Sequence, residues 1–77
     1  MLKFEVGKKY KHNFITNSDL WVTWVVLKRT AKTITIQDVR DVNDVVRRRI
    51  KSDKDTEYVL PFGSYSMAPT LRASRSI

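Results

Sequence analysis

Residues 20–36, LWVTWVVLKRTAKTITI, constrain the fold more than any other stretch, because they have the pattern of two β-strands joined by a short turn. In the first strand both faces are largely apolar, so we expect it to lie in the centre of a sheet. In the second strand isoleucines alternate with threonines, which predicts one buried face and one solvated face. The hairpin should therefore supply much of the core, through Val22, Trp24, Val26, Ile34 and Ile36.

The turn of this hairpin is basic, since Lys28, Arg29 and Lys32 surround Thr30 and Ala31. The same bias runs through the whole chain, in which 15 Lys and Arg outnumber 8 Asp and Glu and give a formal net charge of +7. Such an excess attracts polyanions, and nucleic acid is the commonest polyanion of a cytosol. Charge that only keeps a small protein soluble is the alternative explanation.

A further strand is predicted before the hairpin. Residues 2–6 alternate apolar and charged side chains, which indicates a strand that Gly7 ends or bends. The polar residues 16–19 favour a turn that leads into the hairpin. Between them we expect the strand to resume after the glycine, with an aromatic inner face that consists of Tyr10, His12 and Phe14.

After the hairpin, residues 45–51 are expected to form a strand with a strongly basic outer side. Arg48 falls on the inner side, which is costly unless its stem packs and its guanidinium is paired or reaches the rim. A helix over 38–50 capped by Asp38 is the alternative, because the apolar residues there also fit a helical spacing. Most of these residues are valines, which suit a strand better than a helix.

Residues 52–56 have the composition of a charged hairpin loop before a last strand around 58–62, which Pro61 marks as an edge strand or an ending. Five short strands with tight connections predict an all-β fold, namely a small five-stranded antiparallel barrel that is SH3-like or, alternatively, OB-like. Residues 1–72 should form this single domain, with 73–77 as a frayed tail.

The chain has 77 residues and no cysteine, which fits one domain without disulfides and points to the cytoplasm. Its beginning lacks the apolar region of a signal peptide, and the longest apolar run, 20–27, is too short to span a bilayer. We therefore expect a cytoplasmic protein that has no membrane partner.

The sequence carries no recognisable catalytic signature. His12 is the sole histidine, and its place on the inner aromatic face predicts a packed and hydrogen-bonded side chain. Asp38, Asp41 and Asp44 are spaced by three, but the loop lacks the glycine and the terminal glutamate of an EF-hand, so we expect a solvated acidic loop and no metal site. Neither enzyme activity nor a cofactor is expected.

The strongest functional pattern combines basic and aromatic residues. Basic side chains recur on three predicted strands or at their ends, and if these strands are neighbours, their outer faces line one positive groove in which aromatic rings stack on unpaired bases. Aromatic residues packed in the core and scattered charges are the alternative. The candidate residues that bind nucleic acid or a protein partner are Lys9, Lys11, Trp21, Lys28, Arg29, Lys32, Arg47, Arg49, Lys51 and Tyr65.

Three runs, FEVGKKY at 4–10, KRTAKTITI at 28–36 and PFGSYSMAP at 61–69, together resemble short, largely uncharacterised β-rich proteins encoded on bacterial plasmids, conjugative transposons and phages. The resemblance brings no catalytic residues. It implies a role either in the DNA transactions of the mobile element or in its contest with host defences, as for anti-CRISPR and antirestriction inhibitors. Residues 37–44 depart from the resemblance, because this connection is longer than the one expected in that group.

Two functions of different classes follow. The first is a non-enzymatic, nucleic-acid-binding small β-barrel protein of a mobile element, whose basic residues contact phosphates. The second is a protein inhibitor encoded by a phage or another mobile element, which places the same basic face on an acidic or nucleic-acid-binding surface of a host defence protein. Self-association into a homodimer through an exposed apolar face is a third possibility.

Overall fold

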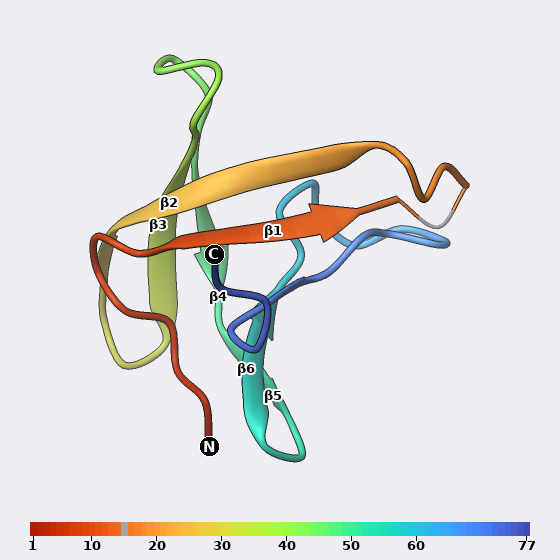
Figure 1. Ribbon diagram of the computed structural model, residues 1–77. Coiled ribbons are helices and arrows are strands. Elements are labelled where there is room, and N and C mark those ends of the chain that lie inside the picture. The colour runs from red at the N-terminus through yellow and green to blue at the C-terminus, as the bar shows by residue number, and fades with distance from the viewer. Residues whose placement is uncertain (15) are drawn as a thin grey trace.

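The structure, a computed structural model, describes residues 1–14 and 16–77. Its strands form an antiparallel four-stranded sheet in the order β1-β2-β3-β4 and a three-stranded sheet in the order β5-β6-β7 (Figure 1). They are β1 (Lys9–Asn13), β2 (Trp21–Arg29), β3 (Thr33–Asp38), β4 (Val45–Arg49), β5 (Lys51–Asp53), β6 (Thr56–Val59) and β7 (Leu71–Arg72). The all-β prediction is confirmed and the helix over 38–50 is wrong, whereas a closed barrel is not found among the described residues. None of these residues belongs to a helix that could cross a bilayer.

The predicted hairpin is present as β2 and β3, which pair antiparallel. The Thr30 hydroxyl fixes its turn, since it accepts a hydrogen bond from the Lys32 amide at 3.2 Å. The register shifts between Val26 and Lys28, which is the mark of a β-bulge. As a result Lys28 pairs with Thr35 and is exposed on the outer side of the sheet.

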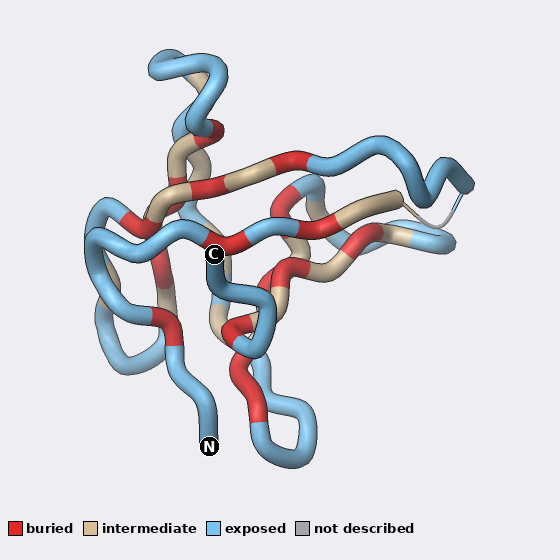
Figure 2. Tube along the Cα trace, in the orientation of Figure 1, coloured by how far each residue is buried: buried red, intermediate tan, exposed pale blue. Residues whose placement is uncertain are grey.

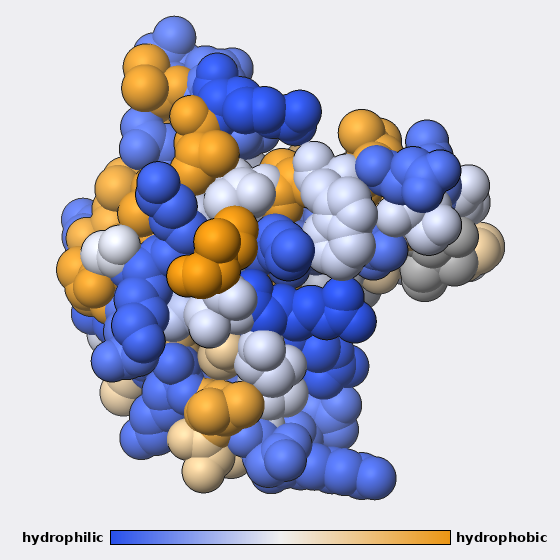
Figure 3. Space-filling view, viewed as in Figure 1, coloured by the Kyte–Doolittle hydropathy of each residue, from blue (hydrophilic) through white to orange (hydrophobic). Residues whose placement is uncertain are grey.

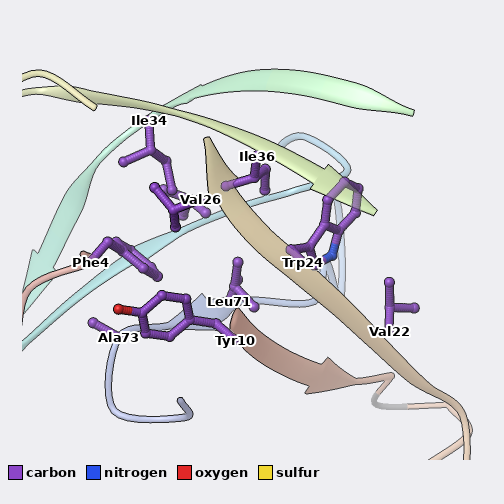
Figure 4. Close-up of a cluster of buried hydrophobic side chains, with 10 residues drawn as sticks. Phe4, Tyr10, Val22, Trp24, Val26, Ile34, Ile36, Leu71 and Ala73 are labelled. Atoms are coloured by element: carbon purple, nitrogen blue, oxygen red, sulfur yellow. The ribbon is translucent and has the colours of Figure 1, made fainter. Parts of the chain in front are cut away.

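The core gathers around the predicted inner face of this hairpin (Figure 4). All five predicted core residues are buried, and Trp24 and Ile36 have no exposed surface. Phe4 and Tyr10 pack edge to face in the same cluster, with ring centroids 4.9 Å apart. In Figure 2 the buried positions fall before residue 39 and after residue 55. The second sheet adds to the same core through Val59 and Leu71.

β4 shows the alternation that the sequence predicts, with Arg47 and Arg49 exposed and Arg48 half-buried between them. The Arg48 guanidinium donates from Nε to the carbonyl oxygens of Leu60 and Pro61, each at 3.2 Å. These carbonyls belong to the segment that follows β6. The conflict expected at Arg48 is therefore resolved, because the half-buried charge bonds to backbone oxygens of the second sheet's connection.

The strand predicted over 2–6 is wrong. Leu2 forms one isolated bridge to β6, and the next backbone groups bond to side chains instead of to a neighbouring strand. The Phe4 amide donates to Glu57 Oε1 at 2.9 Å, and the Phe4 carbonyl accepts from Arg29 Nη1 at 2.8 Å. These partners satisfy the backbone of Phe4, so no ladder of strand hydrogen bonds is needed there.

Arg29 and Glu57 form a bidentate ion pair that joins β2 to β6. Arg29 Nη1 donates to Glu57 Oε1 at 2.7 Å and Nη2 donates to Oε2 at 3.1 Å. The Glu57 side chain is 7% exposed and that of Arg29 is 19% exposed. Burial by itself raises the pKa of the Glu57 carboxyl, but hydrogen bonds from Arg29 and from the Phe4 amide outweigh this and lower the pKa. Glu57 therefore stays ionised and holds the guanidinium in place.

The C-terminal segment, for which the sequence predicts fraying over 73–77, is paired with β1 in the structure. Ser76 forms an antiparallel bridge to Tyr10, and the Lys11 amide donates to the Arg75 carbonyl oxygen at 3.1 Å. Ala73 is buried. In Figure 1 the chain end accordingly lies beside β1, which has β2 on one edge and the C-terminal segment on the other.

Loss of the Arg29–Glu57 pair should destabilise the protein strongly. Glu57→Gln removes the charge that compensates Arg29, and we expect it to lower the free energy of unfolding by roughly 3 kcal/mol. The double variant Arg29→Gln/Glu57→Gln leaves no unpaired charge and keeps side-chain amides beside the Phe4 amide and carbonyl, so it should lose less stability than Glu57→Gln alone. Urea unfolding followed by tryptophan fluorescence measures both losses.

Asp53→Asn is the matched control, because it breaks an ion pair to Arg72 whose side chains are 47% and 35% exposed. We expect this variant to lose about 0–1 kcal/mol. An equally small loss in Glu57→Gln would show that the buried pair does not hold the two sheets together.

Candidate nucleic-acid interface

Five exposed basic side chains lie on the outer side of the four-stranded sheet, and we call them the basic face. Alternation along β1 and β4, together with the bulge in β2, turns these side chains away from the core. All of them reach solvent. The basic face consists of Lys9, Lys11, Lys28, Arg47 and Arg49.

Strand pairing arranges part of the basic face in rows across the sheet. Lys28 of β2 lies beside Thr35 of β3, and Thr35 lies beside Arg47 of β4. Arg49 follows further along β4, opposite Thr33. Hydroxyl groups between cations suit phosphate oxygens, which accept hydrogen bonds from both. A groove of about 320 Å³ follows this row and is lined by Lys28, Thr30, Thr33, Thr35 and Arg47.

The basic face has no carboxylate partner within the part of the chain that the structure describes. The strands β1 to β4 contain one acidic residue, Asp38, and its side chain is buried on the inner side. The ion pairs between described residues use other cations, namely Lys8, Arg29, Arg40 and Arg72. Unneutralised charge concentrated on one face raises the local potential and attracts a polyanion.

Trp21 adds an aromatic surface at the start of β2. Its side chain is 39% exposed, with Lys11 Nζ 4.8 Å and the Arg75 guanidinium carbon 6.0 Å from the ring centroid. Cations at these distances are attracted to the ring. No local pattern in the sequence predicts the contact with Arg75, because Arg75 approaches Trp21 only through the pairing of the chain end with β1.

The four other residues predicted to bind nucleic acid or a partner lie outside the basic face. Arg29 is bound in the ion pair with Glu57, so we leave it out of the basic face. Lys32 is exposed in the turn between β2 and β3, at the border of the face. Lys51 is exposed on β5 of the second sheet, and Tyr65 is 55% exposed on the segment between β6 and β7. Six of the ten candidates therefore share one sheet face.

His12 is buried, and its Nε2 accepts a hydrogen bond from Trp24 Nε1 at 3.1 Å. Because Trp24 can only donate, the neutral imidazole carries its proton on Nδ1. Burial lowers the pKa of His12 below its ordinary value of 6.5, and the hydrogen bond with the Asn13 carbonyl and the charge of Asp38 offset this only in part. The prediction of a packed and hydrogen-bonded histidine is confirmed.

The aspartates over 38–44 build a turn. Asp38 Oδ1 accepts from the Arg40 amide at 2.9 Å, and Asp41 Oδ1 accepts from the Asn43 amide at 3.0 Å. Both carboxylates thus serve the loop backbone, and the prediction of a solvated loop fails at Asp38, which is buried. In residues 1–14 and 16–77 no three His, Cys, Asp or Glu side chains are grouped so that they could hold a metal ion.

On the face of the molecule seen in Figure 3, the exposed hydrophobic residues do not indicate a partner. They form separate patches there among hydrophilic residues. Scattered patches are ordinary on the surface of a monomer. A homodimer therefore stays a prediction from the sequence.

No family model, no curated protein and no solved structure matches the chain. The strongest functional feature of the described residues is the combination of the basic face with Trp21.

The state of His12 should make stability depend on pH. In the unfolded chain His12 takes up a proton near its ordinary pKa of 6.5, whereas the folded protein resists protonation because the pKa is lowered. Below pH 6.5 the unfolded state therefore binds more protons than the folded state. As the pH is lowered through this range, the free energy of unfolding should fall by up to about 1.4 kcal/mol per pH unit, and above pH 6.5 it should stay constant.

Urea unfolding at a series of pH values measures this dependence. His12→Gln keeps an acceptor for Trp24 Nε1 and removes the titrating group, so its stability should be nearly flat from about pH 7 to pH 5, above the range of the carboxyl groups. The same slope in the variant and in the natural protein would contradict the assignment to His12.

Proposed function

We propose that this protein is a non-enzymatic nucleic-acid-binding protein that holds DNA or RNA along the basic face. The observation that carries the proposal is the register of the four-stranded sheet, which sets five exposed cations on one side, with no carboxylate pairing to them in the described part of the chain. Counterion release on contact with phosphates supplies most of the affinity of such a surface.

The composition of the face favours contacts with the backbone of a nucleic acid over contacts with base edges. Lys, Arg and Thr side chains commonly contact phosphate and sugar, and contacts of this kind carry no direct information on sequence. Trp21 adds a ring on which an unpaired base stacks, a contact worth about 1–3 kcal/mol per base. We therefore expect single strands to bind better than duplexes, with little preference for sequence.

We assign an SH3-like barrel as the architecture of the domain that carries this surface. Two junctions between the sheets support this assignment. Ile50 alone separates β4 from β5, so one nearly continuous strand takes part in both sheets. At the other end Ser76, which lies shortly after β7, bridges to Tyr10 of β1. Junctions at both ends are what closure of a small barrel requires.

Binding should weaken steeply with salt, and loss of one phosphate contact should reduce that dependence. We expect Arg47→Gln to bind a fluorescent oligonucleotide more weakly whatever its sequence, and to lower the slope of log K against log salt by about 0.7 for a single strand. Fluorescence anisotropy titrations with single-stranded DNA, single-stranded RNA and duplex DNA over a range of salt give both quantities.

Lys54→Asn is the control with the same loss of charge. Lys54 lies in the turn between β5 and β6 at a φ of 51°, a conformation that asparagine tolerates, and this hairpin belongs to the three-stranded sheet, not to the sheet that carries the basic face. This variant should bind as the natural protein does. If both variants weaken binding equally, the loss in Arg47→Gln reflects net charge and not a contact on the basic face. If the natural protein does not bind at low salt, the proposal is contradicted.

The same basic face also allows the alternative function, in which the protein comes from a mobile element and inhibits a host defence protein. A pull-down from nuclease-treated host lysate separates the two functions. A stoichiometric protein partner that survives nuclease and is lost in Arg47→Gln would favour the inhibitor, whereas partners that disappear with nuclease favour the proposed function.

A further inference from the structure

A cavity of about 210 Å³ lies at the end of β1, outside the basic face. Its walls come from three parts of the chain that are distant in sequence: the end of β1, the segment 68–70, and the arginines of β7 and of the C-terminal segment. The polar residues among them are His12, Asn13, Thr70, Arg72 and Arg75. No carboxylate lines this cavity among the described residues.

The two arginines differ in how they are held. Arg72 Nη1 donates to Asp53 at 3.0 Å, and its guanidinium carbon lies 5.3 Å from the Tyr58 ring centroid. A guanidinium has five N–H donors, so others remain for a ligand while these contacts fix the side chain in advance. Arg75 is exposed, and its cation–π contact with Trp21 leaves its charge unneutralised by any described carboxylate.

His12 supplies a buried donor in the wall of the same cavity. Its side chain is 3% exposed, and the bond from Trp24 leaves the proton on Nδ1. The contact of Nδ1 with the Asn13 carbonyl is long, at 3.5 Å, where about 2.9 Å is typical of an N–H···O bond. The Asn13 carbonyl is thus a weak partner for this donor.

We infer that this cavity binds the terminal phosphate of a nucleic-acid strand, with Arg72 and Arg75 as its charged ligands. A terminal phosphate carries a charge of about −1.5 to −2 at pH 7 and three free oxygens, which matches two guanidinium groups and neighbouring donors. A phosphodiester inside a strand carries a single charge, and the strand would have to enter and leave the cavity. The inference rests on the proposed function, and it assigns one end of the bound strand to the region between β1 and β7.

The test compares one labelled sequence in three forms: phosphorylated at the 5′ end, phosphorylated at the 3′ end, and without terminal phosphate. The form whose end the cavity accepts should bind about tenfold more tightly than the strand without phosphate, because charge-assisted hydrogen bonds are gained. Arg75→Gln should abolish this difference. Arg49→Gln removes the same charge from the basic face and should weaken all three forms by one common factor.

The outcomes separate the two claims. Equal binding of all three forms overturns the phosphate site and leaves the proposed function intact, whereas no binding of any form overturns both. A preference that persists in Arg75→Gln or is lost equally in Arg49→Gln also overturns the site, because general attraction then explains it. Circular dichroism melting of both variants checks that each is folded as the natural protein is.

Discussion

The ion pair between Arg29 and Glu57 is the interaction on which the rest of the structure depends. It connects the end of β2 to β6, and the same two side chains bind the amide and the carbonyl of Phe4. Three segments that share no continuous strand pairing are thus fixed at one point. A small domain has little hydrophobic core to spare, so a satisfied charge pair at the junction of its sheets matters more than it would in a larger protein.

The fold also decides which charges remain free. Arg29 of the basic hairpin is bound in the buried ion pair with Glu57, and Arg48 is bound to backbone carbonyls. Both residues are nevertheless neighbours in sequence of residues of the basic face. Acidic residues go to turns, to the buried pair or to exposed pairs, as at Asp38, Glu57 and Asp53. Cations are then the only charged side chains that β1 to β4 place on the outer side of the four-stranded sheet, and this separation of charge is the basis for the proposed binding of a polyanion.

Much of the four-stranded sheet could be predicted from the sequence, because its strands follow the period of two that local sequence reveals: Trp24 and Ile36 inside, Arg47 and Arg49 outside. The failures share a physical cause. Phe4 is held by side chains distant in sequence, and Ser76 pairs with Tyr10 across almost the whole chain. No local pattern reports such partners. For the same reason the sequence suggested the basic face but neither the place of Arg75 nor the cavity behind it.

The most direct test of the basic face as the binding surface is a map by amide chemical-shift perturbation, recorded while an unlabelled single-stranded oligonucleotide is added to the ¹⁵N-labelled protein. If the basic face binds the strand, the largest perturbations fall on β1, on the β2–β3 hairpin around Lys28 and Thr35, and on β4 at Arg47 and Arg49. Perturbations centred on the aspartate turn over 38–44 or on the β5–β6 hairpin would contradict the claim that the basic face is the binding surface.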